Sequence, residues 1–185
     1  MEQHWTAAKR ILRYLKGTWE MSLIYRLNQE DLKGYVDSDW DNYITDQRLY
    51  IEFVFFLSHA PITWESRKQR TVALSSTEAE YMDLTEATKE AIYLQRFLTE
   101  IGLKKLSTVT IYNDSASAQE LAKNPVYHGR TKHINVRHHF VREALKNHLI
   151  RLNYLCSAEM ITDIFTKALP LNKYYKSIKS LGSFL

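Results

Sequence analysis

The stretch that decides the fold is TVALSSTEAEYMDLTEATKEAIYLQRFLTEIG, residues 71–102. Hydroxyl side chains at residues 75–77 are suited to cap a helix N-terminus, and Gly102 is a typical helix stop. Between them, apolar residues recur every three or four positions, which predicts an amphipathic helix of about seven turns with one face fit to pack on a β-sheet. The residues of that face are Leu84, Ala87, Ala91, Leu94, Leu98 and Ile101.

One acidic residue of this helix lies in line with the apolar face. Glu80 comes four residues before Leu84 and extends the face at its N-terminal end, whereas Glu78 points about 200° away from it. Two readings follow from the helix alone. Glu80 either faces solvent or closes a capping box, or it holds a metal ion together with carboxylates from elsewhere in the chain.

Length and composition indicate one globular domain with an extra arm. The chain has 185 residues, 45% of them hydrophobic, which is enough for one well-buried core. A single cysteine, Cys156, excludes an internal disulfide and indicates a reducing compartment. No signal-peptide pattern and no apolar run of about 20 residues occur, so we expect no membrane association.

Basic residues are concentrated rather than spread evenly, although the net charge is only +4. Residues 122–151 contain seven Lys or Arg against one acid, Glu143, and a second cluster of Arg67, Lys68 and Arg70 follows Trp64. These clusters suit an anionic partner such as a phosphate backbone. A solvated helix face and a charge-protected sheet edge would give the same patterns. The histidines between 122 and 151 lack recognised zinc-ligand spacing, so we expect no metal there.

The rest of the chain alternates between strand and helix patterns. We expect helices over residues 2–16, 115–123, 130–147 and 157–169, and strands over residues 21–27, 32–37, 49–57, 62–65, 107–113 and 149–155. Residues 28–31 turn the first strand into the second, and the tail from Leu171 has little pattern and is expected to fray. This order predicts a mixed α/β layer.

Three further carboxylates stand near the ends of these elements. Asp37 ends the strand over residues 32–37, Asp114 ends the strand over residues 107–113, and Asp163 lies in the last helix. Taken singly, an Asx turn explains Asp37, and a helix N-cap at Asp114 or Ser115 explains Asp114.

Together with Glu80, these acids come from four separate elements that can meet at one end of the sheet. Carboxylates so near to one another require a cation to remain ionised. A ligand set made only of oxygen atoms favours Mg²⁺ or Mn²⁺. Two such ions about 4 Å apart are suited to phosphodiester cleavage.

The chain resembles the RNase H domain at the C-terminal end of the Pol polyprotein of copia-type LTR retrotransposons. The resemblance reaches about Leu169, and the matching stretches are WTAAKRILRYLKGT, GYVDSDW, ITWESRKQRTVALSSTEAEYMDLTEATKEAIYLQRFL, IYNDSASAQELAKNPVYHGRTKHINVRHHFVRE and DIFTKAL. It implies residues 1–30 as the end of the connection region after the reverse transcriptase, residues 31–170 as the RNase H domain and residues 171–185 as a tail. A chain that opens inside a helix fits a piece of a longer protein.

The resemblance also implies fold and activity. The fold is the RNase H-like five-stranded mixed β-sheet flanked by helices, and the activity is cleavage of the RNA strand of RNA:DNA hybrids with two Mg²⁺ or Mn²⁺ ions. Asp37 then bridges both ions, Glu80 and Asp114 complete one site, and Asp163 completes the other. The implied partners are the hybrid and the reverse transcriptase of the same polyprotein, in a cytoplasmic virus-like particle or in the nucleus. Seven residues are the candidate nucleic-acid contacts: Arg67, Lys68, Arg70, Ser115, Arg130, Lys132 and His133.

Two departures from the family matter. Residues 47–52 read QRLYIE where the family is rich in Ser, Thr and Gly, so we expect a reshaped hairpin with Tyr50 or Ile51 exposed. Residues 156–159 lack the histidine that cellular relatives carry before the last helix, so we expect slow turnover. The alternative function is a catalytically inactive or domesticated nucleic-acid-binding domain. A transposase or junction resolvase on the same type of fold is disfavoured by the long matching stretches.

Overall fold

In the computed structural model of the chain, the described residues are 2–25, 31–39, 50–69, 73, 75–103, 108–124, 132–165, 169–181 and 183–184. The long helix, α2, spans Ser76–Glu100 as predicted. The Ser75 hydroxyl caps it by accepting a hydrogen bond from the Glu78 backbone N–H at 3.1 Å. Gly102 follows its C-terminus with a φ of 84°, a left-handed conformation that glycine adopts without strain.

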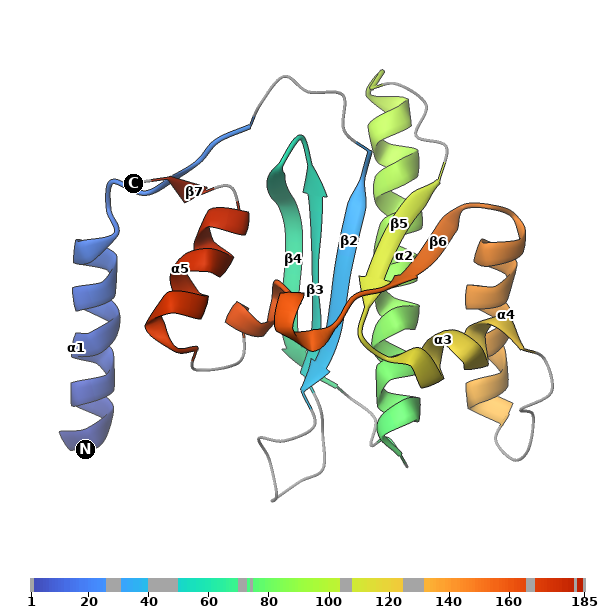
Figure 1. The fold of residues 1–185 in the computed structure, drawn as a ribbon, viewed down its shortest axis with the longest axis horizontal. Coiled ribbons are helices and arrows are strands. Elements are labelled where there is room, and N and C mark those ends of the chain that lie inside the picture. Colours follow the sequence, from blue (N-terminus) through green and yellow to red (C-terminus); the bar gives the residue numbers. More distant parts are fainter. Residues whose placement is uncertain are drawn as a thin grey trace.

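The apolar face of α2 is buried along most of its length. Leu84, Ala87 and Ala91 are fully buried, and Leu94 and Leu98 nearly so. The prediction was wrong for Ile101, whose side chain is 57% exposed. The reason is that α2 extends past the edge of the sheet, as Figure 1 shows, so its last turn has no strand beneath it.

The main sheet has five strands in the order β4-β3-β2-β5-β6, which confirms the predicted mixed sheet. The strands are β2 (Lys33–Asp39), β3 (Tyr50–Leu57), β4 (Ala60–Lys68), β5 (Val109–Asn113) and β6 (Ile150–Tyr154). β2, β3 and β4 form an antiparallel meander, and β2, β5 and β6 run parallel. β4 is longer than the predicted 62–65, and its Pro61 is tolerated because β4 is an edge strand.

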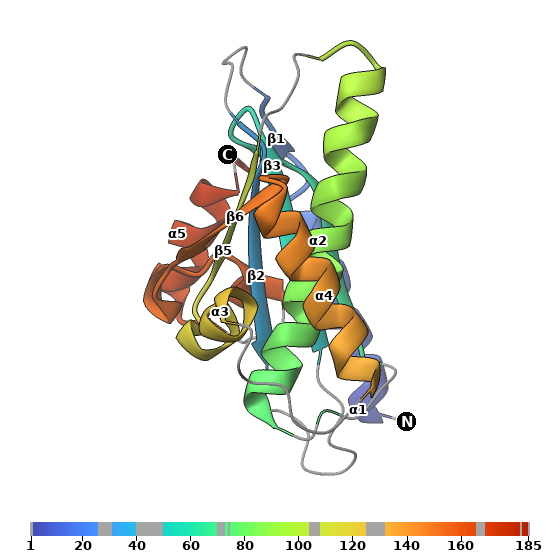
Figure 2. The ribbon, with the colours of Figure 1, turned by 90° about the vertical axis from the view of Figure 1, so that its right-hand side faces the viewer.

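Helices cover both faces of this sheet. α2 and α4 (Lys132–Lys146) lie on one face and α5 (Leu171–Ser180) on the opposite side, as Figure 2 shows, while α3 (Ala116–Lys123) follows β5. All of residues 51–56 on β3 are buried. The expectation of a reshaped hairpin with Tyr50 or Ile51 exposed was therefore wrong from residue 50 onward. Ile51 is 4% exposed, Tyr50 is half-buried, and β3 pairs with β2 without a shift. Gln47 and Leu49 lie outside the described residues.

The segment after β6 differs from the predicted helix over residues 157–169. It forms two short 3₁₀ turns, Ser157–Glu159 and Thr162–Phe165. Met160 between them is extended, with φ −67° and ψ 122°, so helical hydrogen bonding cannot run through it. The expectation of a frayed tail was also wrong, because residues 171–180 form α5.

The two ends of the chain meet outside the main sheet. α1 spans Glu2–Gly17 as predicted, and β1 (Ser22–Leu23) pairs antiparallel with β7 (Ser183–Phe184). β1 is shorter than the predicted strand over residues 21–27, and it belongs to a different sheet from β2. Most of the predicted turn over residues 28–31 lies outside the described residues. α1 contains no buried residue, and Figure 1 shows it beyond α5, away from the main sheet.

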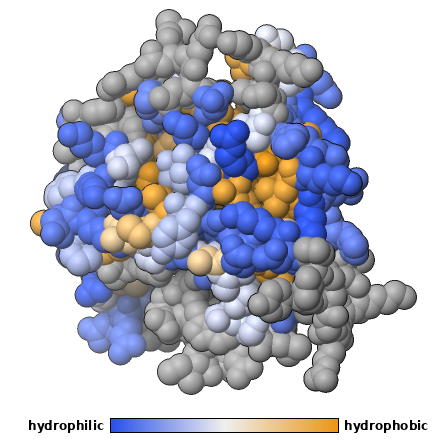
Figure 3. All heavy atoms as spheres, turned by 45° about the vertical axis from the view of Figure 1, so that its right-hand side comes forward, coloured by the Kyte–Doolittle hydropathy of each residue, from blue (hydrophilic) through white to orange (hydrophobic). Residues whose placement is uncertain are grey.

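On the face seen in Figure 3, hydrophilic residues dominate, and apolar residues are exposed between them near the centre. Among the described helices, none has the length and apolar character needed to cross a membrane.

Candidate active site

Two of the predicted carboxylates meet because β2 and β5 are neighbouring parallel strands. Their register pairs Tyr35 with Tyr112. Asp37 and Asp114 each come two residues later, so parallel pairing carries both to the same end of the sheet. Asp37 is 4% exposed, and Asp114 is the first residue after β5.

α2 adds the third carboxylate. Glu80 lies in the second turn of the helix, near the N-terminus fixed by the Ser75 cap. One ligand oxygen from each of Asp37, Glu80 and Asp114 lies within 4.8 Å of the others. Within the described residues, no other trio of His, Cys, Asp or Glu side chains meets this criterion.

This triad fits a divalent cation. Three carboxylates this close repel one another strongly unless a cation or protons intervene. Hard oxygen ligands, with no thiolate or imidazole among them, favour Mg²⁺ or Mn²⁺ over the softer transition metals. Glu80 is half-buried beside Asp37 and Asp114, a position that suits the metal-holding reading, which stays a prediction.

Hydroxyl groups surround the Asp114 side of the triad. The Ser157 hydroxyl donates to Asp114 Oδ2 at 2.5 Å. Ser115 caps α3 by accepting a hydrogen bond from the Ala118 backbone N–H, as one of the two readings predicted. Its hydroxyl lies 3.1 Å from that of Ser117, to which Thr77 of the α2 N-terminus donates at 3.3 Å. This chain of hydroxyls links the beginnings of two helices, α2, which carries Glu80, and α3, which follows Asp114.

The fourth predicted carboxylate, Asp163, is not a member of the triad. Its side chain is 6% exposed, and the Lys173 ammonium of α5 lies 2.6 Å from its Oδ2. Sequence reasoning missed Lys173, since the tail that carries it was expected to fray. The lysine pattern of α5 gave no signal for this contact, which forms only when α5 packs beside the 3₁₀ turn Thr162–Phe165.

Two more carboxyl groups are buried next to the triad, and sequence reasoning gave neither a role. Glu52 is fully buried and pairs in register with Asp37. Asp83 is fully buried on α2, and its Oδ1 accepts a hydrogen bond from the Gln69 side chain at 2.6 Å. Asp83 lies four residues from both Ala79 and Ala87, so the helical period was a signal for its burial.

Burial raises the pKa of Asp83 well above its ordinary value. The Gln69 hydrogen bond opposes this shift, while the nearby charges of Glu80, Glu52 and Asp37 reinforce it. The oxygen that does not bond to Gln69, Oδ2, is buried and has no hydrogen-bond partner. The Asp83 carboxyl therefore favours its neutral form and adds no negative charge beside the triad.

Part of the predicted nucleic-acid contact set lies within the described side chains. Arg67 lies on β4 and pairs with Glu65 and, at 3.6 Å, with Glu86, and Lys68 ends the same strand half-buried. Ser115 is the α3 cap. Lys132 and His133 begin α4 with side chains outside the described set, and Arg70 and Arg130 lie outside the described residues.

Comparison with known proteins gives close relatives but no matching protein-family model. The chain is 43% identical over 173 residues to the retrovirus-related Pol polyprotein from transposon TNT 1-94 of Nicotiana tabacum, a match that covers 94% of this chain. It is 34% identical over 182 residues to the Pol polyprotein from transposon RE2 of Arabidopsis thaliana, covering 98% of this chain. This chain is a homologue of retrotransposon Pol polyproteins.

The Pol homologue corresponds to a small part of these relatives, 13% of the tobacco protein and 12% of the Arabidopsis protein. Among solved structures, it resembles LC11-RNase H1 in complex with an RNA/DNA hybrid, with a TM-score of 0.50 and 13% identity. This match covers 70% of the Pol homologue and 88% of that chain. The RNase H-like fold predicted from the sequence is confirmed.

Proposed function

We propose that this chain is the ribonuclease H domain of a retrotransposon Pol polyprotein and that it hydrolyses the RNA strand of RNA:DNA hybrids during reverse transcription. The observation that carries the proposal is the triad of Asp37, Glu80 and Asp114 at one end of an RNase H-like sheet. The homology to Pol polyproteins supports it, as does the hybrid bound by the structural neighbour LC11-RNase H1.

The proposed division of labour follows from the site. Asp37, Glu80 and Asp114 hold Mg²⁺ or Mn²⁺, and Asp163 serves a second ion. Bound divalent ions lower the pKa of the attacking water and neutralise charge on the leaving oxygen. The chain's own residues fix the geometry: the parallel ends of β2 and β5 place two of the acids, and the Ser157 hydroxyl orients Asp114.

The rest of the proposal concerns context. Basic residues on β4 and α4 contact the hybrid backbone, so cleavage shows little sequence preference. Residues 31–170 form the catalytic domain, residues 1–30 end the connection region, and the reverse transcriptase is the partner. The proposed location is a cytoplasmic virus-like particle or the nucleus.

A second candidate is a non-catalytic domain that still binds nucleic acid. The observation that favours it is the ion pair of Asp163 with Lys173, which occupies a carboxylate that a second metal ion requires. Cleavage separates the two candidates.

The test is cleavage of a hybrid labelled on its RNA strand, in Mg²⁺ and in Mn²⁺. We expect scission by the wild type and a loss of at least about 100-fold in Asp37→Asn and Asp114→Asn, which corresponds to about 2.7 kcal/mol of lost transition-state stabilisation. Asp31→Asn, an exposed aspartate before β2, is the matched control and retains activity. A folded wild type that binds the hybrid without cutting it would instead support the second candidate.

A further inference from the structure

The ion pair of Asp163 and Lys173 links α5 to the candidate active site. The Lys173 Nζ lies 2.6 Å from Asp163 Oδ2, with side chains 33% and 6% exposed. An ionised carboxylate this deeply buried is stabilised by a positive partner. Here the partner is an ammonium group of the chain itself, at a carboxylate proposed above to bind a divalent ion.

Asp163 lies close to the strands that build the site. Its 3₁₀ turn, Thr162–Phe165, packs against β2 and β3, and β2 ends in the segment that carries Asp37. The Thr162 hydroxyl in the same turn is buried without a hydrogen-bond partner. The turn that carries Thr162 and Asp163 therefore lies against β2 and β3, and Lys173 adds a positive charge beside it.

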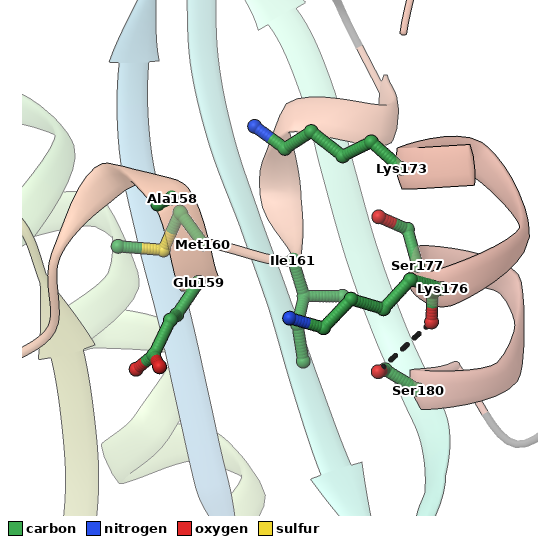
Figure 4. Close-up of a pocket in the computed structure, with 8 residues that line it drawn as sticks. All are labelled: Ala158, Glu159, Met160, Ile161, Lys173, Lys176, Ser177 and Ser180. Carbon is green, nitrogen blue, oxygen red and sulfur yellow. Dashed lines mark hydrogen bonds between the residues drawn. The ribbon is translucent and has the colours of Figure 1, made fainter. Parts of the chain in front are cut away.

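α5 contributes little to the buried core, and its contact with Asp163 is made by a long side chain. Ser177 is its one buried residue, and no α5 residue belongs to the hydrophobic core clusters of the described chain. A pocket separates α5 from residues 158–161, and Figure 4 shows the Lys173 and Lys176 side chains reaching from α5 toward that segment. A lysine ammonium on a flexible four-carbon stem can leave a carboxylate without a backbone rearrangement.

We propose that Lys173 is the resident cation of Asp163, so that a divalent ion binds Asp163 only by displacing the Lys173 ammonium. The inference rests on the proposed function, because it concerns the second metal position of that site. Both cations would bind the same carboxylate, and two positive charges a few ångströms apart repel each other, so they compete. Lys173 thus sets the affinity of the second position and leaves the triad of Asp37, Glu80 and Asp114 unaffected.

The test is calorimetric titration of the metal-free full chain with Mn²⁺, without nucleic acid. Lys173→Met keeps the apolar stem and removes the charge. We expect it to bind a second Mn²⁺ equivalent at least about tenfold more tightly than the wild type, with the first equivalent unchanged. Lys179→Met, an exposed lysine on the same helix, makes the same change in net charge and is expected to match the wild type.

Two further variants test whether the tighter Mn²⁺ binding of Lys173→Met arises at Asp163. Asp163→Asn combined with Lys173→Met is expected to abolish the tighter second equivalent, and Asp37→Asn is expected to lose the first. Identical isotherms for the wild type, Lys173→Met and Lys179→Met would overturn the inference while the triad site stands, and so would a gain that persists in the double variant. Absence of Mn²⁺ binding by the folded wild type and by every variant would overturn the metal centre itself, and the inference with it.

Discussion

Asp83 is a carboxyl group in the core of the domain, one helical turn after Glu80. Burial raises its pKa, so the folded chain keeps a proton that the unfolded chain loses near the ordinary value of 3.8. Between these two pKa values the native state binds more protons than the unfolded state. The Asp83 contribution to stability is therefore present below pH 3.8 and is lost as the pH rises through the raised pKa.

Asp83→Asn removes this pH dependence while keeping the acceptor for Gln69. We expect the variant to unfold with nearly the wild-type free energy at pH 4 and to be more stable by at least about 1 kcal/mol at pH 8. Urea unfolding of the wild type and the variant at both pH values measures the difference, in which the titration of groups remote from Asp83 cancels. The exposed Asp31→Asn gives no such trend. A pH-independent difference for Asp83→Asn would show that this carboxyl is ionised in the fold.

At the same scale, sequence reasoning found the triad but not its surroundings. Asp37 and Asp114 were predictable because strand ends can be read from the pattern and parallel neighbours bring such ends together. Glu80 followed from the helical period. Lys173 was not predictable, because its contact with Asp163 depends on how two irregular segments pack in space.

Elements with a strong apolar period were predicted well, and those without one were not. α2 and the five strands of the main sheet have patterns set by burial on the sheet. α5 has few buried positions, and one of its contacts is the hydrogen bond from the Tyr174 hydroxyl to that of Tyr14 on α1, 160 positions away in sequence. Contacts between residues so far apart in the chain produce no periodic pattern in the local sequence.

β2 and β3 approach closely at Gly34, which makes a prediction at the scale of the sheet. A Cβ at Gly34 would lie 2.5 Å from Cε1 of Phe55, a fully buried ring that cannot move aside easily. We therefore expect Gly34→Ala to destabilise the fold by about 1–3 kcal/mol in urea unfolding. Gly17→Ala is the matched control, because no atom lies within 4 Å of its Cβ position. Equal stabilities for the two variants would mean that the β2–β3 packing is looser than described.

The whole molecule divides into a core around α2 and the main sheet, and an outer layer formed by α1, α5, β1 and β7. Leucines occur in both parts, which allows a matched comparison. Leu84 of α2 is fully buried in the core, whereas Leu12 of α1 is 62% exposed. α1 also presents apolar Trp5 and Ile11 to the surroundings, each more than half exposed.

Truncating each leucine tests this division. We expect Leu84→Ala to lower the free energy of unfolding by about 2–5 kcal/mol, because it removes buried methyl groups and leaves a cavity. Leu12→Ala is expected to stay within about 0.5 kcal/mol of the wild type, because its side chain loses little contact with water on folding. Denaturant unfolding followed by circular dichroism gives both values. A loss of more than about 1 kcal/mol in Leu12→Ala would mean that α1 packs on the domain in solution, and that the stability of the core depends on the outer layer.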